Sequence, residues 1–215
     1  MRFLITAGPT REPIDPVRYL SNRSSGKMGY AIAEAAIEAQ HQVVLISGPV
    51  SLDRPPGAAL ISVSTGDQMF DAVHEQIGNC DVLVMCAAVA DYKPARVSKS
   101  KLKKRETGIS LELTPTRDIL ASLPKQDRHY LVVGFAAETE NIEANAQKKL
   151  REKNCDIIVA NDARIGMEND ENEVTIFLRD GEIKKISRAP KKIISRELVK
   201  ILENYFEKRL TKKIR

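Results

Sequence analysis

A series of apolar segments of strand length, alternating with helical patterns, constrains the fold of this chain more than any other feature of its sequence. Arg2–Ala7 (RFLITA) is typical of a strand, Lys27–Ala39 has apolar residues at helical spacing, and Gln42–Ser47 (QVVLIS) is typical of a second strand. These segments form one βαβ unit. Their strands are continuously apolar, as a parallel sheet covered on both faces requires. We therefore predict a doubly wound, Rossmann-like α/β fold with a mostly parallel sheet and helices on both faces.

The alternation continues through the rest of the chain. It predicts further strands at Leu60–Val63, Asp81–Cys86, Tyr130–Phe135 and Asp156–Ala160, with helices over about Asp67–Ile77 and Ile142–Lys153. A small β-hairpin extension follows, with strands Glu173–Leu178 and Glu182–Ile186 around an Asp180-Gly181 turn, and a last helix covers about Lys192–Lys208.

Length and composition limit the class of protein. The 215 residues are 42% hydrophobic and 29% charged, and no apolar run approaches the ~20 residues of a membrane span, so we expect a soluble globular protein. The amino terminus lacks the pattern of a secretory signal, which predicts a cytoplasmic protein. Cys80, Cys86 and Cys155 are too widely spaced for a disulfide framework, and the absence of a CxxC pair argues against a structural zinc site.

Positive charge is concentrated at the carboxyl end of the chain. The whole chain carries +5, and residues 208–215 hold five basic and no acidic side chains, so residues 1–207 are neutral. We predict a single domain over residues 1–209 and a basic tail over residues 210–215. For this tail we favour a solvated end over a nucleic-acid-binding arm.

The glycines after the first strand are spaced unlike those of an ordinary dinucleotide-binding fingerprint. Gly8 ends the strand, whereas Gly26 and Gly29 open the next helix, and a polar loop is inserted between them. With Ser24 and Ser25, this helix start offers backbone N–H groups for an anion. The serines are equally well explained as helix caps, so the pattern alone leaves both interpretations open.

A nicotinamide oxidoreductase is one alternative function, and the sequence argues against it. An acidic residue for the ribose hydroxyls is expected at the end of the second strand, where the chain has Ser47-Gly48-Pro49. No tyrosine is followed four residues later by lysine, and Gly26-Lys27-Met28 does not complete a phosphate-binding P-loop.

The segment after Asp81–Cys86 combines a carboxylate with basic residues. Asp91 lies near the strand end and is followed by Lys99, Lys101, Lys103, Lys104 and Arg105. Ammonium groups can neutralise a departing pyrophosphate, so the segment suits a nucleoside triphosphate site. By charge count alone, however, a solvated basic loop is the favoured interpretation.

Four segments of the chain carry a family resemblance. They are ITAGPTREPIDPVRYLSNRSSGKMG (Ile5–Gly29), AAVADYKP with the later KLKK (Ala87–Lys104), VGFAAET (Val133–Thr139) and ANDA (Ala160–Ala163). In this order they resemble the phosphopantothenoylcysteine synthetase family, also called phosphopantothenate-cysteine ligase, which is the carboxyl-terminal half of a bacterial bifunctional coenzyme A biosynthesis flavoprotein. The resemblance implies that CTP activates 4′-phosphopantothenate as an acyl-cytidylate with release of pyrophosphate. The amine of cysteine would then displace CMP.

The resemblance also implies roles for particular residues. Asn22 would be catalytic at the amine-attack step, although a turn-forming asparagine is the simpler interpretation, and Lys101 would be catalytic by facing the phosphates. The substrate-binding residues would be Asn22, Ser24, Ser25 and Gly26. The nucleotide-binding residues would be Gly8, Ala87, Asp91, Lys101, Arg117, Asp118, Ile119, Leu120, Phe135, Lys149 and Lys153.

Two of these implied assignments are open to question from the sequence itself. Arg117 stands where related bacterial sequences commonly have proline. Lys149 and Lys153 lie on one helix face, and without the resemblance they would be interpreted as exposed helix lysines.

The resemblance implies partners as well. Mg²⁺ is expected to bind through the substrate phosphates, with no protein ligand named. A homodimer is expected, with Glu173–Ile186 as its candidate extension, although a hairpin that covers a sheet edge within one monomer explains this segment equally well. A flavin-dependent phosphopantothenoylcysteine decarboxylase would be a separate polypeptide or an excised half. No membrane or nucleic-acid partner is expected, and a nucleic-acid-binding module is kept with the oxidoreductase as an alternative.

Overall fold

The computed structural model describes residues 1–104, 106–138, 140–162 and 169–214. Four positions named above, Arg105, Thr139, Ala163 and Arg215, lie outside these described residues. In the described part of the chain, no helix combines the length and the apolar character that a membrane span requires.

Eight strands form the central sheet. They are β1 (Arg2–Ala7), β4 (Gln42–Ser47), β5 (Ala59–Ser62), β6 (Val82–Met85), β9 (Leu131–Glu138), β10 (Ile157–Asp162), β11 (Glu171–Leu178) and β12 (Ile183–Pro190). Their order across the sheet is β12-β11-β10-β9-β6-β1-β4-β5. The six strands from β10 to β5 are parallel, and β11 and β12 add an antiparallel hairpin. The predicted doubly wound α/β fold is therefore confirmed, and its strand order reverses between β1 and β6.

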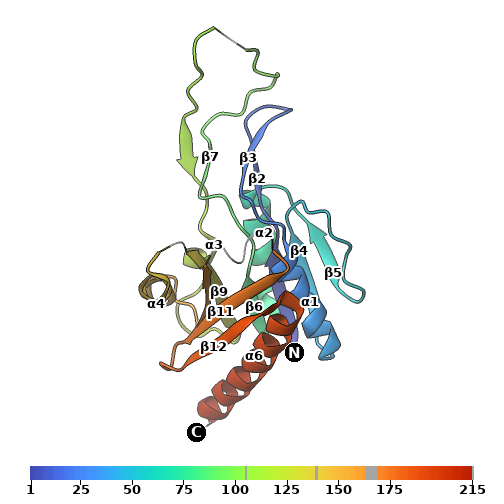
Figure 1. Cartoon of the computed structure of the whole chain (residues 1–215), viewed down its shortest axis with the longest axis vertical. Coiled ribbons are helices and arrows are strands. Elements are labelled where there is room, and N and C mark those ends of the chain that lie inside the picture. Colours follow the sequence, from blue (N-terminus) through green and yellow to red (C-terminus); the bar gives the residue numbers. More distant parts are fainter. Residues whose placement is uncertain (105, 139, 163–168, 215) are drawn as a thin grey trace.

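Helices cover both faces of this sheet because successive residues of each strand point to opposite sides. In β1, Phe3 and Ile5 pack on the face that carries α1 and α6, while Leu4 packs on the face that carries α2, α3 and α4. Figure 1 shows α1 and α6 lying together on their face. The helices are α1 (Lys27–Glu38), α2 (Gly66–Gln76), α3 (Ile119–Ser122), α4 (Ile142–Glu152) and α6 (Lys191–Ile214), and a 3₁₀ turn, η1 (Ile77–Asn79), follows α2.

The last helix is longer than predicted. It continues to Ile214 rather than ending near Lys208, so residues 208–214 are helical and do not form an extended tail. The basic residues of this segment occur at spacings that a helix accommodates as readily as a coil, which is why charge alone did not indicate the end of the helix. The domain boundary at residue 209 stays a prediction.

Two short hairpins lie outside the central sheet and were not predicted. They pair β2 (Arg11–Pro13) with β3 (Tyr19–Ser21), and β7 (Tyr92–Pro94) with β8 (Leu113–Pro115). We call residues 92–104 and 106–115 the arm. In Figure 1 the β2–β3 hairpin and the arm project together from the end of the molecule opposite the carboxyl terminus. Their strands have three residues each, and three of the four include proline, so they lack the apolar runs that identified the other strands.

The arm is held to the β2–β3 hairpin by a buried carboxylate. Asp15, in the turn of the hairpin, accepts hydrogen bonds from Arg18 Nη2 at 2.5 Å and from the backbone N–H of Leu102 at 3.1 Å. Arg18 in turn donates to the Leu102 carbonyl at 2.6 Å. The Arg18 guanidinium is the main reason that the pKa of Asp15 lies well below its usual value.

A second buried carboxylate joins the amino ends of β9 and β10 to α6. Asp156 Oδ2 accepts hydrogen bonds from Arg128 Nη2 at 2.9 Å and from the Val132 N–H at 2.8 Å, and Arg209 Nη1 of α6 lies 3.4 Å away. Asp156 and Arg128 are each only 5% exposed. This pair is shielded from water, so loss of one partner would leave the other as an unbalanced buried charge.

We expect Asp156→Ala to destabilise the protein by about 3–5 kcal/mol, because it removes the carboxylate that balances the buried Arg128 charge. Urea unfolding followed by circular dichroism measures the change. Glu197→Ala is the matched control, since it breaks an exposed ion pair with Lys200 and should cost less than about 1 kcal/mol. Equal midpoints for the two variants would contradict the assignment.

Candidate active site

Two adjoining cavities lie at the carboxyl edge of the sheet, where the strand order reverses. The first cavity, of about 320 Å³, lies between the start of α1 and the start of α6. The second, of about 420 Å³, lies between the end of β6, α3 and α4. They share Ala87, Val89, Phe135 and Lys149 as a common wall. Their volumes are in the ~300–1,000 Å³ range of ligand sites, and an open α/β sheet binds ligands at this edge.

The start of α1 has no side-chain cap. Its N-cap residue is Gly26, in the left-handed region with φ 78°, and no side chain accepts a hydrogen bond from the first turn. Ser24 Oγ instead accepts from the Gly26 N–H at 3.3 Å. By contrast, α2 begins with a complete capping box between Thr65 and Gln68. Capping by Ser24 or Ser25 is therefore wrong, and the N–H groups of the first turn of α1 are oriented to bind an anion.

The widely spaced glycines of the fingerprint meet in space. A Cβ atom on Gly26 would lie 3.4 Å from both the backbone nitrogen and the Cα of Gly8. A Cβ atom on Gly29 would lie 2.6 Å from Ala7 Cβ, so only glycine allows α1 to approach the end of β1 this closely. The inserted loop forms the β2–β3 hairpin outside the central sheet. The glycines on either side of the loop therefore remain close together.

The second cavity brings together most of the residues implied for nucleotide binding. Lys149 donates to the Phe135 carbonyl at 2.6 Å, and Lys153 forms an ion pair with Asp118. Burial raises the pKa of Asp118, but the Lys153 ammonium and the Ala121 amide outweigh it, so this pKa lies below its usual value. The implied residues that line the cavity are Ala87, Asp91, Arg117, Asp118, Ile119, Leu120, Phe135, Lys149 and Lys153.

Arg117 is fixed by contacts to α2. Its guanidinium donates to Asp67 at 3.0 Å and to Asp71 at 2.8 Å, and it stacks over the Phe70 ring at 4.0 Å. Asp67 also pairs with Lys93, and the Lys93 ammonium is the main reason that the pKa of Asp67 lies below its usual value. This network holds the segment before α3 in place.

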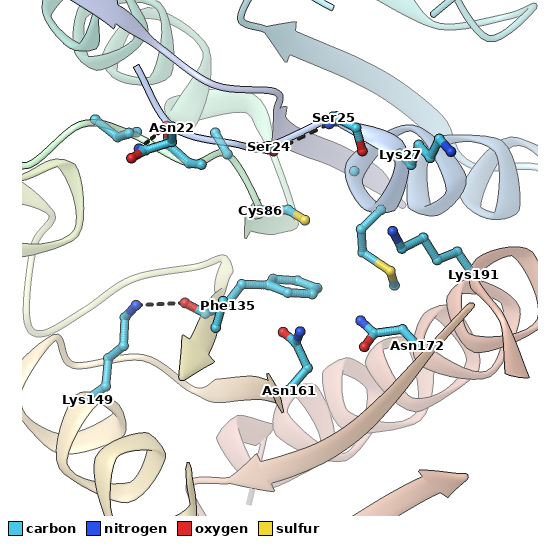
Figure 2. Close-up of a pocket in the computed structure, with 17 residues that line it drawn as sticks. Asn22, Ser24, Ser25, Lys27, Cys86, Phe135, Lys149, Asn161, Asn172 and Lys191 are labelled. Carbon is cyan, nitrogen blue, oxygen red and sulfur yellow. Dashed lines mark hydrogen bonds between the residues drawn. The ribbon is translucent and has the colours of Figure 1, made fainter. Parts of the chain in front are cut away.

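The first cavity contains the four residues implied for substrate binding: Asn22, Ser24, Ser25 and Gly26. Figure 2 shows Asn22, Ser24 and Ser25 on one side of the cavity and Phe135, Asn161 and Asn172 on the other. Asn22 Nδ2 donates to the Ala88 carbonyl at 3.0 Å, which ties the loop before α1 to the end of β6. Asn22 also lines a third cavity of about 460 Å³, beside Arg11 and Arg23.

Sequence reasoning missed four polar residues of the first cavity: Lys27, Asn161, Asn172 and Lys191. Asn161 lies in the ANDA segment at the end of β10, so the rule that ligands bind beyond strand ends could have identified it. Asn172 and Lys191 come from the start of β11 and the start of α6. No local pattern marks them, because only the folded sheet brings these two starts to the same edge.

Two implied residues do not line the described cavities. Gly8 lies behind the start of α1, against Gly26. Lys101 is exposed on the arm, next to the Leu102 backbone that Asp15 and Arg18 hold. Lys101 is therefore not brought to the nucleotide-binding residues in this structure, and its role stays a prediction.

The cysteines and the metal-ligating residues limit the chemistry of the site. All three cysteines are free thiols, and burial raises the pKa of Cys86, in the cavity wall, to about 12, which opposes a thiolate nucleophile. Among the described residues, no group of three or more His, Cys, Asp and Glu side chains could hold a metal ion. The residues of the site suit the binding and positioning of an anion.

The structure at the end of β4 does not favour the binding of a dinucleotide. A Cβ atom on Gly48 would lie 1.9 Å from the Pro9 carbonyl oxygen, so the backbone after β1 packs directly against the residue that follows β4, where an acidic residue for the ribose would be expected near the strand end. Ser47 is buried and already hydrogen-bonded to the Tyr30 hydroxyl at 3.1 Å. The structure therefore disfavours the nicotinamide alternative.

Comparison with known proteins relates the chain to one family. The family model described as "DNA/pantothenate metabolism flavoprotein C-terminal domain" matches residues 1–205. The "Coenzyme A biosynthesis bifunctional protein CoaBC" of Bacillus subtilis (strain 168) is 48% identical over 200 residues, covering 91% of this chain and 49% of that protein. The protein of the same name from Escherichia coli (strain K12) is 42% identical over 216 residues, covering 97% of this chain and 53% of that protein. The chain thus spans about half the length of the curated relatives it matches.

Solved structures have the same fold. The crystal structure of a C-terminal domain of CoaBC is 44% identical, with a TM-score of 0.84 and 96% of each chain covered. A Cab2 mutant in complex with phosphopantothenate-cysteine has a TM-score of 0.83 at 15% identity, covering 100% of this chain and 89% of that chain, which is a likeness of fold alone.

We expect Gly29→Ala to destabilise the protein by about 1–3 kcal/mol, because the new methyl group would push α1 away from Ala7. Urea unfolding measures this change. Gly78→Ala is the control, since a Cβ atom there meets nothing within 4 Å, and it should be neutral or slightly stabilising. A Gly29→Ala protein as stable as the wild type would show that this helix start is not tightly packed.

Proposed function

The chain belongs to the family of DNA/pantothenate metabolism flavoprotein C-terminal domains, and we propose that it is a CTP-dependent phosphopantothenate-cysteine ligase. The curated relatives are named for coenzyme A biosynthesis, which supports the proposal. The observation that carries it is the pair of adjoining cavities, one lined by lysines beside an uncapped helix start and the other lined by both carboxylates and cations. A nucleoside triphosphate needs both environments, the first for its phosphates and the second for its ribose and base.

The proposed reaction has two steps. In the first, a carboxylate oxygen of 4′-phosphopantothenate attacks the α-phosphorus of CTP, the bond to the bridging oxygen breaks, and pyrophosphate leaves with that electron pair. In the second, the amine nitrogen of cysteine attacks the activated carbonyl carbon, the bond to the phosphate oxygen breaks, and CMP leaves as the nitrogen loses a proton. A site that binds all three reactants side by side supplies most of the acceleration by orientation.

On the nucleotide side, we propose that Asp91 and Phe135 contact the nucleoside in the second cavity. Lys149 lines both cavities, so its ammonium can reach the phosphates between them. Lys153 is paired with Asp118 and fixes the adjacent wall. The proposed catalytic role of Lys101 requires that the arm bring its ammonium to the phosphates.

On the acceptor side, we propose that Asn22 orients the activated carbonyl for the cysteine amine, since an amide can donate and accept hydrogen bonds together. Asn22 lines both the first and the third cavity, so it lies between the nucleotide and a substrate that enters from the third cavity. Arg11 and Arg23 line the third cavity and can bind the 4′-phosphate.

Mg²⁺ is part of the proposal, because it would neutralise the polyphosphate. No carboxylate lines the first cavity among the described residues, whereas Asp91 and Asp118 line the second. Such a donor set fits an ion whose ligands come mainly from substrate phosphates and water.

The proposed partners include a second copy of the chain and a flavin-dependent phosphopantothenoylcysteine decarboxylase. The relatives are named bifunctional proteins, so in them a second activity lies on the same polypeptide. The predicted extension Glu173–Ile186 falls within β11 and β12, whose hairpin extends the central sheet at β10. Exposed apolar side chains gather instead on the arm, which makes the arm the better candidate for the dimer contact: Tyr92, Val97, Ile109, Leu111 and Leu113.

We expect sustained pyrophosphate release over many turnovers to require CTP, phosphopantothenate and cysteine together, with ATP a poor replacement for CTP. Specificity for cytosine needs hydrogen bonds to its edge, which the backbone around Arg117–Leu120 and Val133–Ala136 can provide. A pyrophosphate-release assay that omits one reactant at a time measures this. Equal or faster turnover with ATP would contradict the specificity, and no dependence on phosphopantothenate would contradict the function.

We expect Asn22→Ala to release one pyrophosphate per site and then stop, because the acyl-cytidylate forms but the amine step fails. Rapid-quench measurement of pyrophosphate and product separates the two steps. Wild-type protein without cysteine is the control and should give the same single release. Loss of the first release in the variant would place Asn22 in activation instead, and unchanged turnover would leave it a turn residue.

A further inference from the structure

Lys191 lies in the wall of the first cavity, on the side opposite the start of α1. It is the first residue of α6 and only 7% exposed. Its Nζ donates to the Asn169 carbonyl at 2.5 Å, which holds the ammonium at this wall. Figure 2 shows the side chain running from the start of α6 toward the start of α1. Neither the family resemblance nor the strand-end rule assigns this residue a role.

The charge of the first cavity is entirely positive. Its lining includes Lys27, Lys149 and Lys191, and no aspartate or glutamate lines it among the described residues. The two other lysines also have partners. Lys27 forms an ion pair at 2.6 Å with the exposed Asp170, and Lys149 donates to the Phe135 carbonyl in the wall shared with the second cavity.

Lys191 is therefore the buried cation on the far side of the first cavity from the second. The starts of both α1 and α6 border the same space, and each adds the partial positive charge of a helix N-terminus. A ligand with a single carboxylate would be balanced by one of these positive groups alone. A ligand with several negative charges in a short length, such as a polyphosphate, uses all of them.

Burial and the nearby Lys27 lower the pKa of Lys191, and Asp170 and Cys86 offset this lowering only in part. Keeping the ammonium charged in this place therefore has a cost. A bound polyanion would offset that cost, because an adjacent negative charge favours the protonated form.

We propose that Lys191 binds the β- and γ-phosphates of the nucleotide in the first cavity. After the bond to the α-phosphate breaks, Lys191 continues to bind these two phosphates as the pyrophosphate product. The inference rests on the proposed function and adds the orientation in which the nucleotide binds. The nucleoside lies in the second cavity, the α-phosphate lies at the shared wall by Lys149, and the leaving group lies between the start of α1 and Lys191. The phosphorus–oxygen bond that breaks is then the one between the shared wall and the first cavity.

The test compares the whole nucleotide with the two parts into which the reaction divides it. Calorimetry measures binding of CTP, CMP and inorganic pyrophosphate to the wild type and to Lys191→Met, which keeps the apolar stem and removes the charge. We expect the variant to bind CTP and pyrophosphate about 10- to 100-fold more weakly and CMP within about twofold of the wild type. Lys191→Arg should recover part of the loss. Lys200→Met, on the exposed side of the same helix, should match the wild type for all three ligands.

The outcomes separate this inference from the proposed function. Unchanged affinity of Lys191→Met for CTP and pyrophosphate would overturn it, and so would an equal loss for all three ligands with a lowered melting temperature. If the wild type binds pyrophosphate but neither nucleotide, and Lys191→Met loses that binding, the anion site stands and the proposed function fails. If the wild type binds CMP and CTP with equal affinity, the function stands and the phosphate role of Lys191 fails.

Discussion

At the end of β1, helix α1 lies directly against the strand because Gly29 has no side chain, and Gly26 at the helix start lies beside Gly8. This contact determines where the rest of the site can lie. It brings the first turn of α1 to the point where the strand order reverses, with N–H groups that no side chain caps. A larger residue at position 29 would move the helix, and both the anion-binding start and the cavity beside it would move with it.

The inserted loop between Gly8 and Gly26 extends this arrangement without disturbing it. The loop forms the β2–β3 hairpin, returns through Asn22, and is tied to the end of β6 by the hydrogen bond from Asn22 to Ala88. Through Asp15 the same hairpin holds the arm at Leu102. One insertion therefore supplies the third cavity, the residue between the cavities and the anchor of the arm.

Sequence patterns predicted the central sheet because buried parallel strands must be apolar along their whole length, as in Gln42–Ser47. They did not predict β2, β3, β7 and β8, whose three-residue strands are too short to show an apolar pattern and whose hairpins are joined by side chains such as Asp15. The site residues divide in the same way. Those in the segments after strands were identified together, whereas Asn172 and Lys191 reach the first cavity only because the β11–β12 hairpin folds back beside β10. Lys101 shows the opposite case, since its loop has the expected charge but lies away from the cavities.

The two cavities differ in how their charges are balanced, and this difference favours one orientation of a ligand that spans both. In the second cavity the Arg117 charge is taken up by Asp67 and Asp71, and the Lys153 charge by Asp118, so that the cavity presents a rigid wall with little excess charge. Such a wall suits a base and a ribose, which are recognised by shape and hydrogen bonds. In the first cavity the lysines face a space that no described carboxylate enters, so the excess positive charge increases from the second cavity toward the first. A molecule that is neutral at one end and strongly anionic at the other is favoured in one orientation only. In the proposed complex this orientation places the α-phosphate at the shared wall by Lys149, with Asn22 in the adjoining first cavity.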